Sequence, residues 1–163
     1  MRRDPEIDQA DHYAAAVYGS IIAAALIEPF FEQHGSAEIV ALTLLSTMSV
    51  FFLAHVWSTL VGERIHTGAR YNAHHTFAIA RAEWPLIEAT FGPVFALVLG
   101  WAGVWSDSTA ERIALAVCLV ELFGWGIVVG RRAYTGWVST VLSGVVNVAL
   151  GAALIWLEVL VLH

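Results

Sequence analysis

Five apolar runs, each long enough to cross a lipid bilayer as a helix, constrain the fold of this chain most strongly. They cover roughly residues 13–31, 37–61, 85–105, 111–130 and 135–161, and a crossing helix needs about 20 mostly apolar residues. Only 13% of the residues are charged, which is about half the share in a typical soluble domain. We therefore expect an all-α, polytopic membrane protein with five transmembrane helices, built as one membrane domain over residues 1–163.

The arginines predict how these helices are oriented. All eight basic residues are arginines, and the cytoplasmic segments of membrane proteins are enriched in positive charge. With the N-terminus inside and the C-terminus outside, the loop 62–84 is cytoplasmic and Arg112 alone lies outside. The arginines then placed in the cytoplasm are Arg2, Arg3, Arg64, Arg70, Arg81, Arg131 and Arg132. A four-span arrangement would put arginines on both sides, so the charge pattern favours five spans.

Ionisable groups fall within several of these spans, where a charged side chain costs about 2.5–3.5 kcal/mol and usually faces a protein interior. His55 and Glu121 lie deepest in their runs. We expect such groups to line a path for an ion or a proton. The candidate residues for this path are His55, Glu63, Glu88, Glu121, Tyr18 and Asn147. The alternative is that these side chains hydrogen-bond across the bundle and fix the positions of the helices.

The second span carries two neighbouring rows of residues with four-residue spacing. Ala54, Ser58 and Gly62 form a row of small residues, which lets another helix approach closely. The adjacent row runs from His55 to Glu63 and is polar, since residues four apart share one helix face. We expect the first row to pack against a helix and the second row to face a polar path.

Three histidines in the loop 62–84 are weak candidates for metal ligands: His66, His74 and His75. A transition-metal site needs several convergent imidazole or carboxylate groups, and adjacent histidines on a helix point about 100° apart. A short interfacial helix is the alternative interpretation, with Phe77 and Trp84 toward lipid.

Composition and motifs exclude other classes of function. The formal net charge of −6 leaves no basic surface for a nucleic acid. The sequence contains no P-loop, no G-x-S-x-G and no H-E-x-x-H motif, so we do not expect an enzyme. An intramembrane enzyme or redox subunit has the least support, because no nucleophile or cofactor motif is found.

The segment AHVWSTLVGER is similar to a signature at the end of the second span in the vacuolar iron transporter family, which reads A-x-x-x-S-M-x-x-G-E-Y. The positions that match in register are Ala54, Ser58, Gly62 and Glu63. Thr59 stands in place of the family's methionine, and the family's intramembrane aspartate falls on Ile22. That family has five spans in the same orientation, forms dimers with the ion path between subunits, and exchanges ferrous or manganous ions for protons. The resemblance thus implies a homodimer with Glu63 as an ion-handling residue.

The chain also looks like small integral membrane proteins of actinobacteria that carry VYGSI and LAHVW signatures. Two functions follow from these observations. The first is a transporter for protons or a divalent cation, with Fe²⁺, Mn²⁺ or Zn²⁺ as the transported ion. The second is a non-catalytic membrane protein that acts through helix–helix contacts. Either function places a multi-pass protein in the cell membrane, expected to be a bacterial inner membrane, with the lipid bilayer and a second copy as partners.

Overall fold

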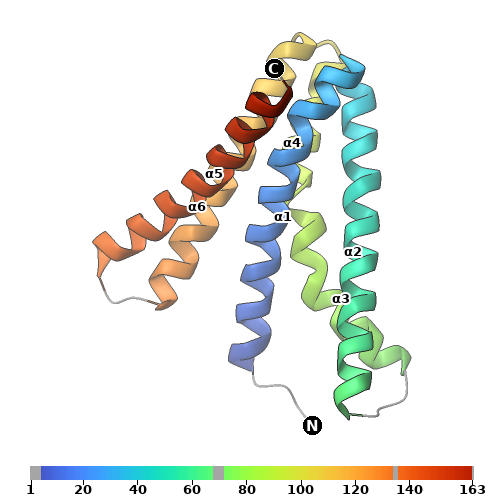
Figure 1. Ribbon diagram of the computed structural model, residues 1–163, viewed down its shortest axis with the longest axis vertical. Helices are drawn as coiled ribbons and strands as arrows, with labels where there is room; N and C mark the ends of the chain where they lie inside the picture. Colours follow the sequence, from blue (N-terminus) through green and yellow to red (C-terminus); the bar gives the residue numbers. More distant parts are fainter. Residues whose placement is uncertain (1–4, 68–71, 134–135, 163) are drawn as a thin grey trace.

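Helices make up nearly all of the computed structural model of the protein (Figure 1), which describes residues 5–67, 72–133 and 136–162. The helices are α1 (Pro5–His34), α2 (Ala37–Thr67), α3 (Ala73–Glu88), α4 (Phe91–Trp101), α5 (Asp107–Ala133) and α6 (Trp137–Leu162). Since these ranges contain no strand, the predicted all-α class is confirmed for them.

Four helices, α1, α2, α5 and α6, are each long and apolar enough to cross a membrane. The pair α3–α4 passes the same test as a unit, although its two helices are bent by 47°. The described chain therefore has four or five candidate spans, as expected for a multi-pass membrane protein. The first described residues and the last ones lie at opposite ends of the bundle (Figure 1). We call these ends the N-terminal end and the C-terminal end.

Helix boundaries differ from the sequence expectation in two places. The predicted loop 62–84 is largely helical, because α2 continues to Thr67 and α3 begins at Ala73. The predicted third span, 85–105, is not one helix: α3 stops at Glu88, and α4 runs only from Phe91 to Trp101. Prolines in both helices of the pair, Pro85 and Pro93, interrupt the helical hydrogen bonding there.

The hydrophobic core fills the half of the bundle nearer the C-terminal end. Side chains of α1, α2, α4 and α5 meet there, and its fully buried members include Ile27, Leu44, Met48, Leu97 and Cys118. The backbone N–H of Ala37 donates to the Asp107 carboxylate at 3.1 Å, which joins the beginnings of α2 and α5. This half of the molecule is closed by apolar packing.

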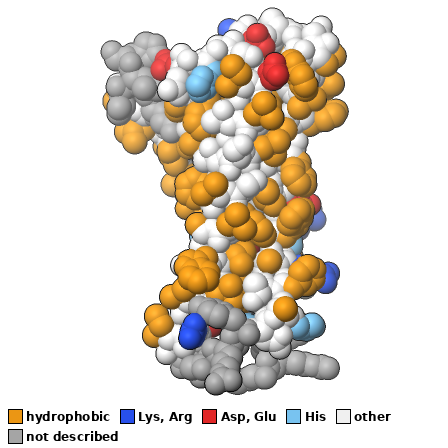
Figure 2. All heavy atoms as spheres, turned by 90° about the vertical axis from the view of Figure 1, so that its right-hand side faces the viewer, with side chains coloured by type: hydrophobic (Ala, Val, Ile, Leu, Met, Phe, Trp, Pro, Cys, Tyr) orange, Lys and Arg blue, Asp and Glu red, His pale blue; other side chains and the backbone are white. Residues whose placement is uncertain are grey.

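The half nearer the N-terminal end is more open. Helices α5 and α6 lean away from α1 toward that end (Figure 1), while α3 stays against α2 through a small second core of Val56, Leu60 and Ile79. Figure 2 views the side on which α2 lies, and hydrophobic side chains cover most of this face between its ends. The exposed large side chains of α2 include Leu53 and Trp57. An apolar outer surface of this kind suits contact with lipid.

Helices α5 and α6 approach each other backbone to backbone. A Cβ atom added at Gly126 would lie 2.5 Å from the Gly144 Cα, and one added at Gly130 would lie 2.8 Å from the Thr140 Cα. Both glycines of α5 are buried. Glycine at these positions therefore permits the close packing that membrane helices use in place of a hydrophobic driving force.

Candidate functional site

A break interrupts the bent pair α3–α4 at Ala89 and Thr90. Pro93 has no backbone N–H and so cannot donate the usual helical hydrogen bond to the Ala89 carbonyl four residues earlier. Thr90 bonds back to α3 instead: its N–H and its hydroxyl both donate to the Ile87 carbonyl, at 3.0 and 2.6 Å. Thr90 is fully buried. The break is thus a buried turn of two residues, both with right-handed helical dihedral angles, at which the direction of the helix changes.

Glu121 of α5 lies against the start of α4, directly beside this break. Its carboxylate oxygen Oε2 accepts a hydrogen bond from the hydroxyl of Ser20, with an Oγ–Oε2 distance of 3.5 Å. Ser20 is fully buried on α1. The other oxygen, Oε1, lies against Gly92, where an added Cβ would collide with it. The absence of a side chain at Gly92 therefore provides the space that the carboxylate occupies.

The helix dipole also favours a carboxylate at this position. The first N–H groups of a helix lack partners inside the helix and carry partial positive charge. Glu121 sits at that end of α4. Discontinuous membrane helices in transporters likewise point the N-terminus of a half-helix at an anionic group. Three helices, α1, α4 and α5, thus surround one carboxylate that is able to exchange a proton.

The polar row of α2 makes a second set of contacts. The rings of His55 and Tyr18 are 5.5 Å apart between centroids, which connects α2 to α1. Further toward the N-terminal end, the Thr59 hydroxyl donates to the Glu83 carboxylate at 3.3 Å. The predicted polar face of α2 therefore does contact its neighbours in the bundle. We call the contacts between α2 and α3 the α2–α3 seam, and the contact of His55 with Tyr18 on α1 lies next to it.

The seam ends at Glu63, which pairs with His75 of α3. From the sequence, Glu63 is a candidate for the ion path and His75 is a weak candidate for a metal ligand. The fold brings these two side chains together. The His75 side chain is 48% exposed. An ion pair so open to solvent contributes little to stability, typically 0–1 kcal/mol.

His55 and Glu121 have different neighbours on α1. His55 contacts Tyr18, whereas Glu121 accepts a bond from Ser20. Two positions along a helix correspond to a rotation of about 200°, so the two ionisable groups face different sides of α1. Among the contacts of the described residues none joins His55 to Glu121, and the single path expected from sequence divides into two polar sites.

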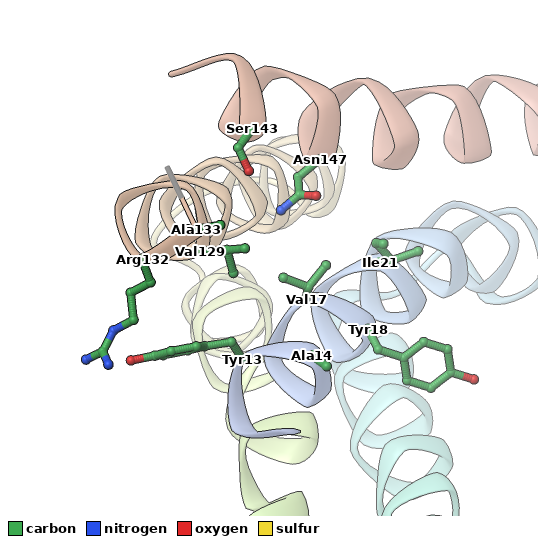
Figure 3. Close-up of a pocket in the computed structure, with 10 residues that line it drawn as sticks. All are labelled: Tyr13, Ala14, Val17, Tyr18, Ile21, Val129, Arg132, Ala133, Ser143 and Asn147. Atoms are coloured by element: carbon green, nitrogen blue, oxygen red, sulfur yellow. The ribbon is translucent and has the colours of Figure 1, made fainter. Parts of the chain in front are cut away.

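The remaining path candidates lie elsewhere. Glu88 ends α3 and is exposed. Asn147, together with Tyr13, Val17 and Tyr18, lines a groove of about 970 Å³ between α1, α5 and α6 (Figure 3). We call this the α1–α5–α6 groove. In Figure 3 the Tyr18 ring points out of the groove, consistent with its contact to His55 on α2.

The loop histidines do not assemble a metal site in the part of the chain that the structure describes. No three or more histidine, cysteine or acidic side chains are close enough there to hold a metal ion. The backbone N–H of His74 instead donates to the Asn72 side chain at 3.2 Å, which caps α3. His66 lies in the last turn of α2, and its side chain is outside the described residues.

The small-residue row of α2 makes no close helix contact within the ranges 5–67, 72–133 and 136–162. Ala54 and Ser58 are exposed, and an added Cβ at Gly62 would meet no atom within 4 Å. The expected close helix contact is found instead between α5 and α6, which the sequence analysis missed. The signal for it was the four-residue spacing of Gly126 and Gly130.

Other residues of the Glu121 site were also missed. Ser20, Thr90 and Gly92 carry no charge, so a search for ionisable groups passes over them. The dipeptide Gly92-Pro93 inside an apolar run is the signal that predicts a break.

Comparisons with protein-family models, with curated proteins and with solved structures find no match for this chain. The resemblance to the vacuolar iron transporter family therefore stays a prediction.

Proposed function

We propose that the protein transports protons across a membrane, alone or in exchange for a cation, and that Glu121 is the group that binds the proton. The observation that supports this function is the position of the Glu121 carboxylate beside the α3–α4 break, held by Ser20 from α1. Ionisable groups inside membrane spans are rare and are often functional. The proposal assigns no catalytic reaction to the chain.

The neighbouring residues suit this role. Ser20 supplies one hydroxyl hydrogen bond to the carboxylate, so the other lone pairs of Glu121 remain available to a proton or a water molecule. Gly92 has no side chain and so leaves room for Oε1. The break at Thr90 gives α4 a joint about which it can turn relative to α3, and such joints absorb the backbone changes of gating motions.

The α2–α3 seam provides a second series of titratable groups toward the N-terminal end. The seam contains the pair of Glu63 with His75, and His55 lies next to it beside Tyr18 of α1. Imidazoles exchange protons near neutral pH. In the proposal, Glu121 binds the proton inside the bundle, and the seam is a separate series of titratable groups nearer the N-terminal end.

A proton is favoured over a divalent cation as the first transported species. One carboxylate is enough to carry a proton, whereas Fe²⁺, Mn²⁺ or Zn²⁺ needs several ligands. Within the described residues of one chain no such ligand group is found. A divalent ion would have to take ligands from a second copy of the chain as well.

Proteoliposome flux tests the proposal. The purified protein is reconstituted in vesicles that contain a pH-sensitive dye, and a potassium diffusion potential of defined sign drives proton entry. We expect proton flux above that of empty vesicles, and we expect Glu121→Gln to abolish it. The matched control is Glu38→Gln, which removes an exposed carboxylate at the start of α2 and should leave the flux unchanged.

The same vesicles test metal ions. Addition of Fe²⁺, Mn²⁺ or Zn²⁺ outside should alter proton flux if exchange occurs. Wild-type flux equal to that of empty vesicles under every gradient, or full flux in Glu121→Gln, would contradict the proposal.

A second function, association through helix–helix contacts without transport, has one specific observation in its favour. The small-residue row of Ala54, Ser58 and Gly62 lies open on the surface of α2, where another helix can approach. Ser58→Leu should then reduce self-association, measured by energy transfer between labelled copies in vesicles. Loss of association together with absent flux in the wild type would favour this second function.

A further inference from the structure

The start of α4 carries backbone donors that lack acceptors. A helix has no internal partner for its first N–H groups, from the cap residue onward, and the cap residue of α4 is Thr90. The N–H of Thr90 donates to the Ile87 carbonyl of α3, and Pro93 has no N–H to donate. Among the described residues, no acceptor is found for the N–H groups of Phe91 and Gly92. Two donors are therefore left over at the start of this helix.

Thr90 does not cap these donors with its own side chain. A threonine at the cap position usually accepts a hydrogen bond from the second or third N–H of its helix. The Thr90 hydroxyl instead donates to the Ile87 carbonyl at 2.6 Å and makes no cap bond to α4. The break lies near the middle of the bent pair α3–α4, where a bilayer has no water to take the two donors. An acceptor from another helix is therefore needed.

Glu121 of α5 is placed to be that acceptor. Its Oε1 atom lies against Gly92, which carries one of the two donors, while its Oε2 atom is held by the Ser20 hydroxyl. No hydrogen bond joins Oε1 to the described start of α4, so the pairing itself is inferred. An ionised carboxylate accepts at both oxygens, whereas a protonated carboxyl group has an O–H that donates. Charged acceptors also form the stronger hydrogen bonds with backbone N–H groups.

From these contacts we propose that ionised Glu121 caps α4 from α5 by accepting from the N–H groups of Phe91 and Gly92, and that proton binding removes this cap. Glu121 is here the proton-binding group of the proposed function, on which this inference rests. The bound proton then has a structural effect, because it weakens the contact between α5 and the first turn of α4. That turn follows the break directly, so the charge of one carboxylate controls how firmly α4 is held at this point.

The other groups around Glu121 leave this role to its carboxylate. The groups that α1 and α4 place against it, a serine hydroxyl and a glycine, do not titrate. Cys118 of the same helix interacts with Glu121, but a thiol ordinarily keeps its proton below about pH 8. Glu88 at the end of α3 is exposed, and the α6 segment Trp137–Leu157 contains no acid or base. A pH-dependent change at the start of α4 therefore reports on Glu121.

Nuclear magnetic resonance of the Gly92 amide tests this inference. The chain is labelled with magnetic isotopes at the phenylalanine carbonyl carbons and the glycine nitrogens, and a spectrum that needs both labels shows only Phe-Gly pairs. These pairs are Phe91-Gly92 and Phe123-Gly124, and the exposed Gly124 is the internal control. As the pH of the micelle sample rises from mildly acid to mildly alkaline, the Gly92 amide proton should move to lower field, several times further than that of Gly124. The reason is that a carboxylate is a stronger acceptor than a carboxyl group.

Two variants identify the group that titrates. Glu121→Gln should abolish the movement of the Gly92 signal, whereas the matched control Glu88→Gln removes an exposed carboxylate four residues before Gly92 and should leave the movement intact. Movement that persists in Glu121→Gln, or that is lost in Glu88→Gln, would overturn the inference. So would a Gly92 signal that stays in place in the wild type, a result that requires no variant to fold.

The two proposals fail separately. Proton flux that is lost in Glu121→Gln, together with a Gly92 signal that does not titrate, would overturn the capping of α4 and leave the proposed function standing. A Gly92 signal that titrates through Glu121 in a chain without proton flux would support the capping of α4 and overturn the proposed function.

Discussion

Two rows of small residues with the same four-residue spacing have opposite positions in the molecule. Gly126 and Gly130 of α5 are buried against the backbone of α6. Ala54 and Ser58 of α2 are exposed and Gly62 is half-buried, and a Cβ added at Gly62 would meet no described atom within 4 Å. The four-residue spacing of small residues therefore allows another helix to approach closely. The topology decides whether that helix belongs to the same chain.

The connection between helices explains the difference. α5 and α6 are consecutive and joined by a short connection, so they lie next to each other as an antiparallel pair. α2 is followed by α3, which packs on the polar side of α2 through Thr59 and Glu63. The small-residue row is left on the neighbouring flank, about 100° away around the helix. Four predictions test this contrast, beginning with the largest expected effect.

Gly126→Ala should destabilise the protein most. The added Cβ would lie 2.5 Å from the Gly144 Cα and 2.8 Å from the Ser143 carbonyl oxygen, and both are backbone atoms that cannot move aside cheaply. Overpacking of this kind costs about 1–3 kcal/mol. The measurement is the free energy of unfolding in mixed micelles with increasing dodecyl sulfate. A loss no greater than that of Gly62→Ala would show that α5 and α6 are not in close contact.

Gly92→Ala should have a smaller effect on stability and a larger effect on function. The atoms that an added Cβ would meet are the Glu121 Oε1 and the Val117 Cγ1, the latter at 2.7 Å. Side-chain atoms can rotate away, so we expect a loss near 1 kcal/mol, the low end of the overpacking range. Displacement of the carboxylate should lower proton flux in vesicles. Unchanged flux at wild-type protein content would separate Gly92 from the proposed proton site.

Much of the architecture could be predicted from sequence, for physical reasons. An apolar run of about 20 residues is long enough to cross the hydrocarbon core of a bilayer as a helix. Such runs therefore predict helices without knowledge of the tertiary contacts. The polar face of α2 follows from the four-residue spacing of His55 and Glu63 alone. The break at Thr90 was not predicted, because the run from 85 to 105 is apolar throughout its middle, and hydropathy averages over a local interruption such as Gly92-Pro93.

The candidate site was predicted less well than the fold. Glu121 was identified because it is a charge in an apolar run, but its partners Ser20 and Gly92 are neutral. The other deep path candidate, His55, lies on another side of α1. Depth along a helix can be read from sequence, whereas rotation around the bundle cannot. Pairings between helices depend on tertiary packing, and one sequence contains no direct record of it.

Thr59→Val should weaken the α2–α3 seam by a modest amount. It removes the hydroxyl that donates to the Glu83 carboxylate at 3.3 Å and keeps the volume of the side chain. Hydrogen bonds between membrane helices average about 0.6 kcal/mol. A double-mutant cycle with Glu83→Met, which removes the acceptor oxygen, read by the same micelle unfolding, should give a coupling energy of that size. A coupling energy of zero would remove this bond from the seam.

The smallest expected effect is that of Gly62→Ala on the free energy of unfolding. The sign of this effect tells whether the small-residue row of α2 is open or in contact with another part of the chain. Among the described residues, the added methyl group meets no atom within 4 Å, and alanine favours a helix over glycine by restricting the unfolded chain. In dilute micelles, where copies are apart, we expect a gain of about 0.4 kcal/mol in the free energy of unfolding, the low end of the range for such substitutions. A loss there would mean that α2 is in contact with some other part of the chain.

Self-association in vesicles is a second measurement for the same variant, and there Gly62→Ala is expected to weaken a contact instead of adding stability. If another copy packs on this row, a methyl group at residue 62 separates the two helices and weakens their contact. Energy transfer between labelled copies should then fall in Gly62→Ala while single-copy stability rises. Unchanged energy transfer would mean that the row faces lipid alone. Gly126 and Gly62 would then differ in whether a helix packs on them: the same spacing would support helix packing in α5 and no helix packing in α2.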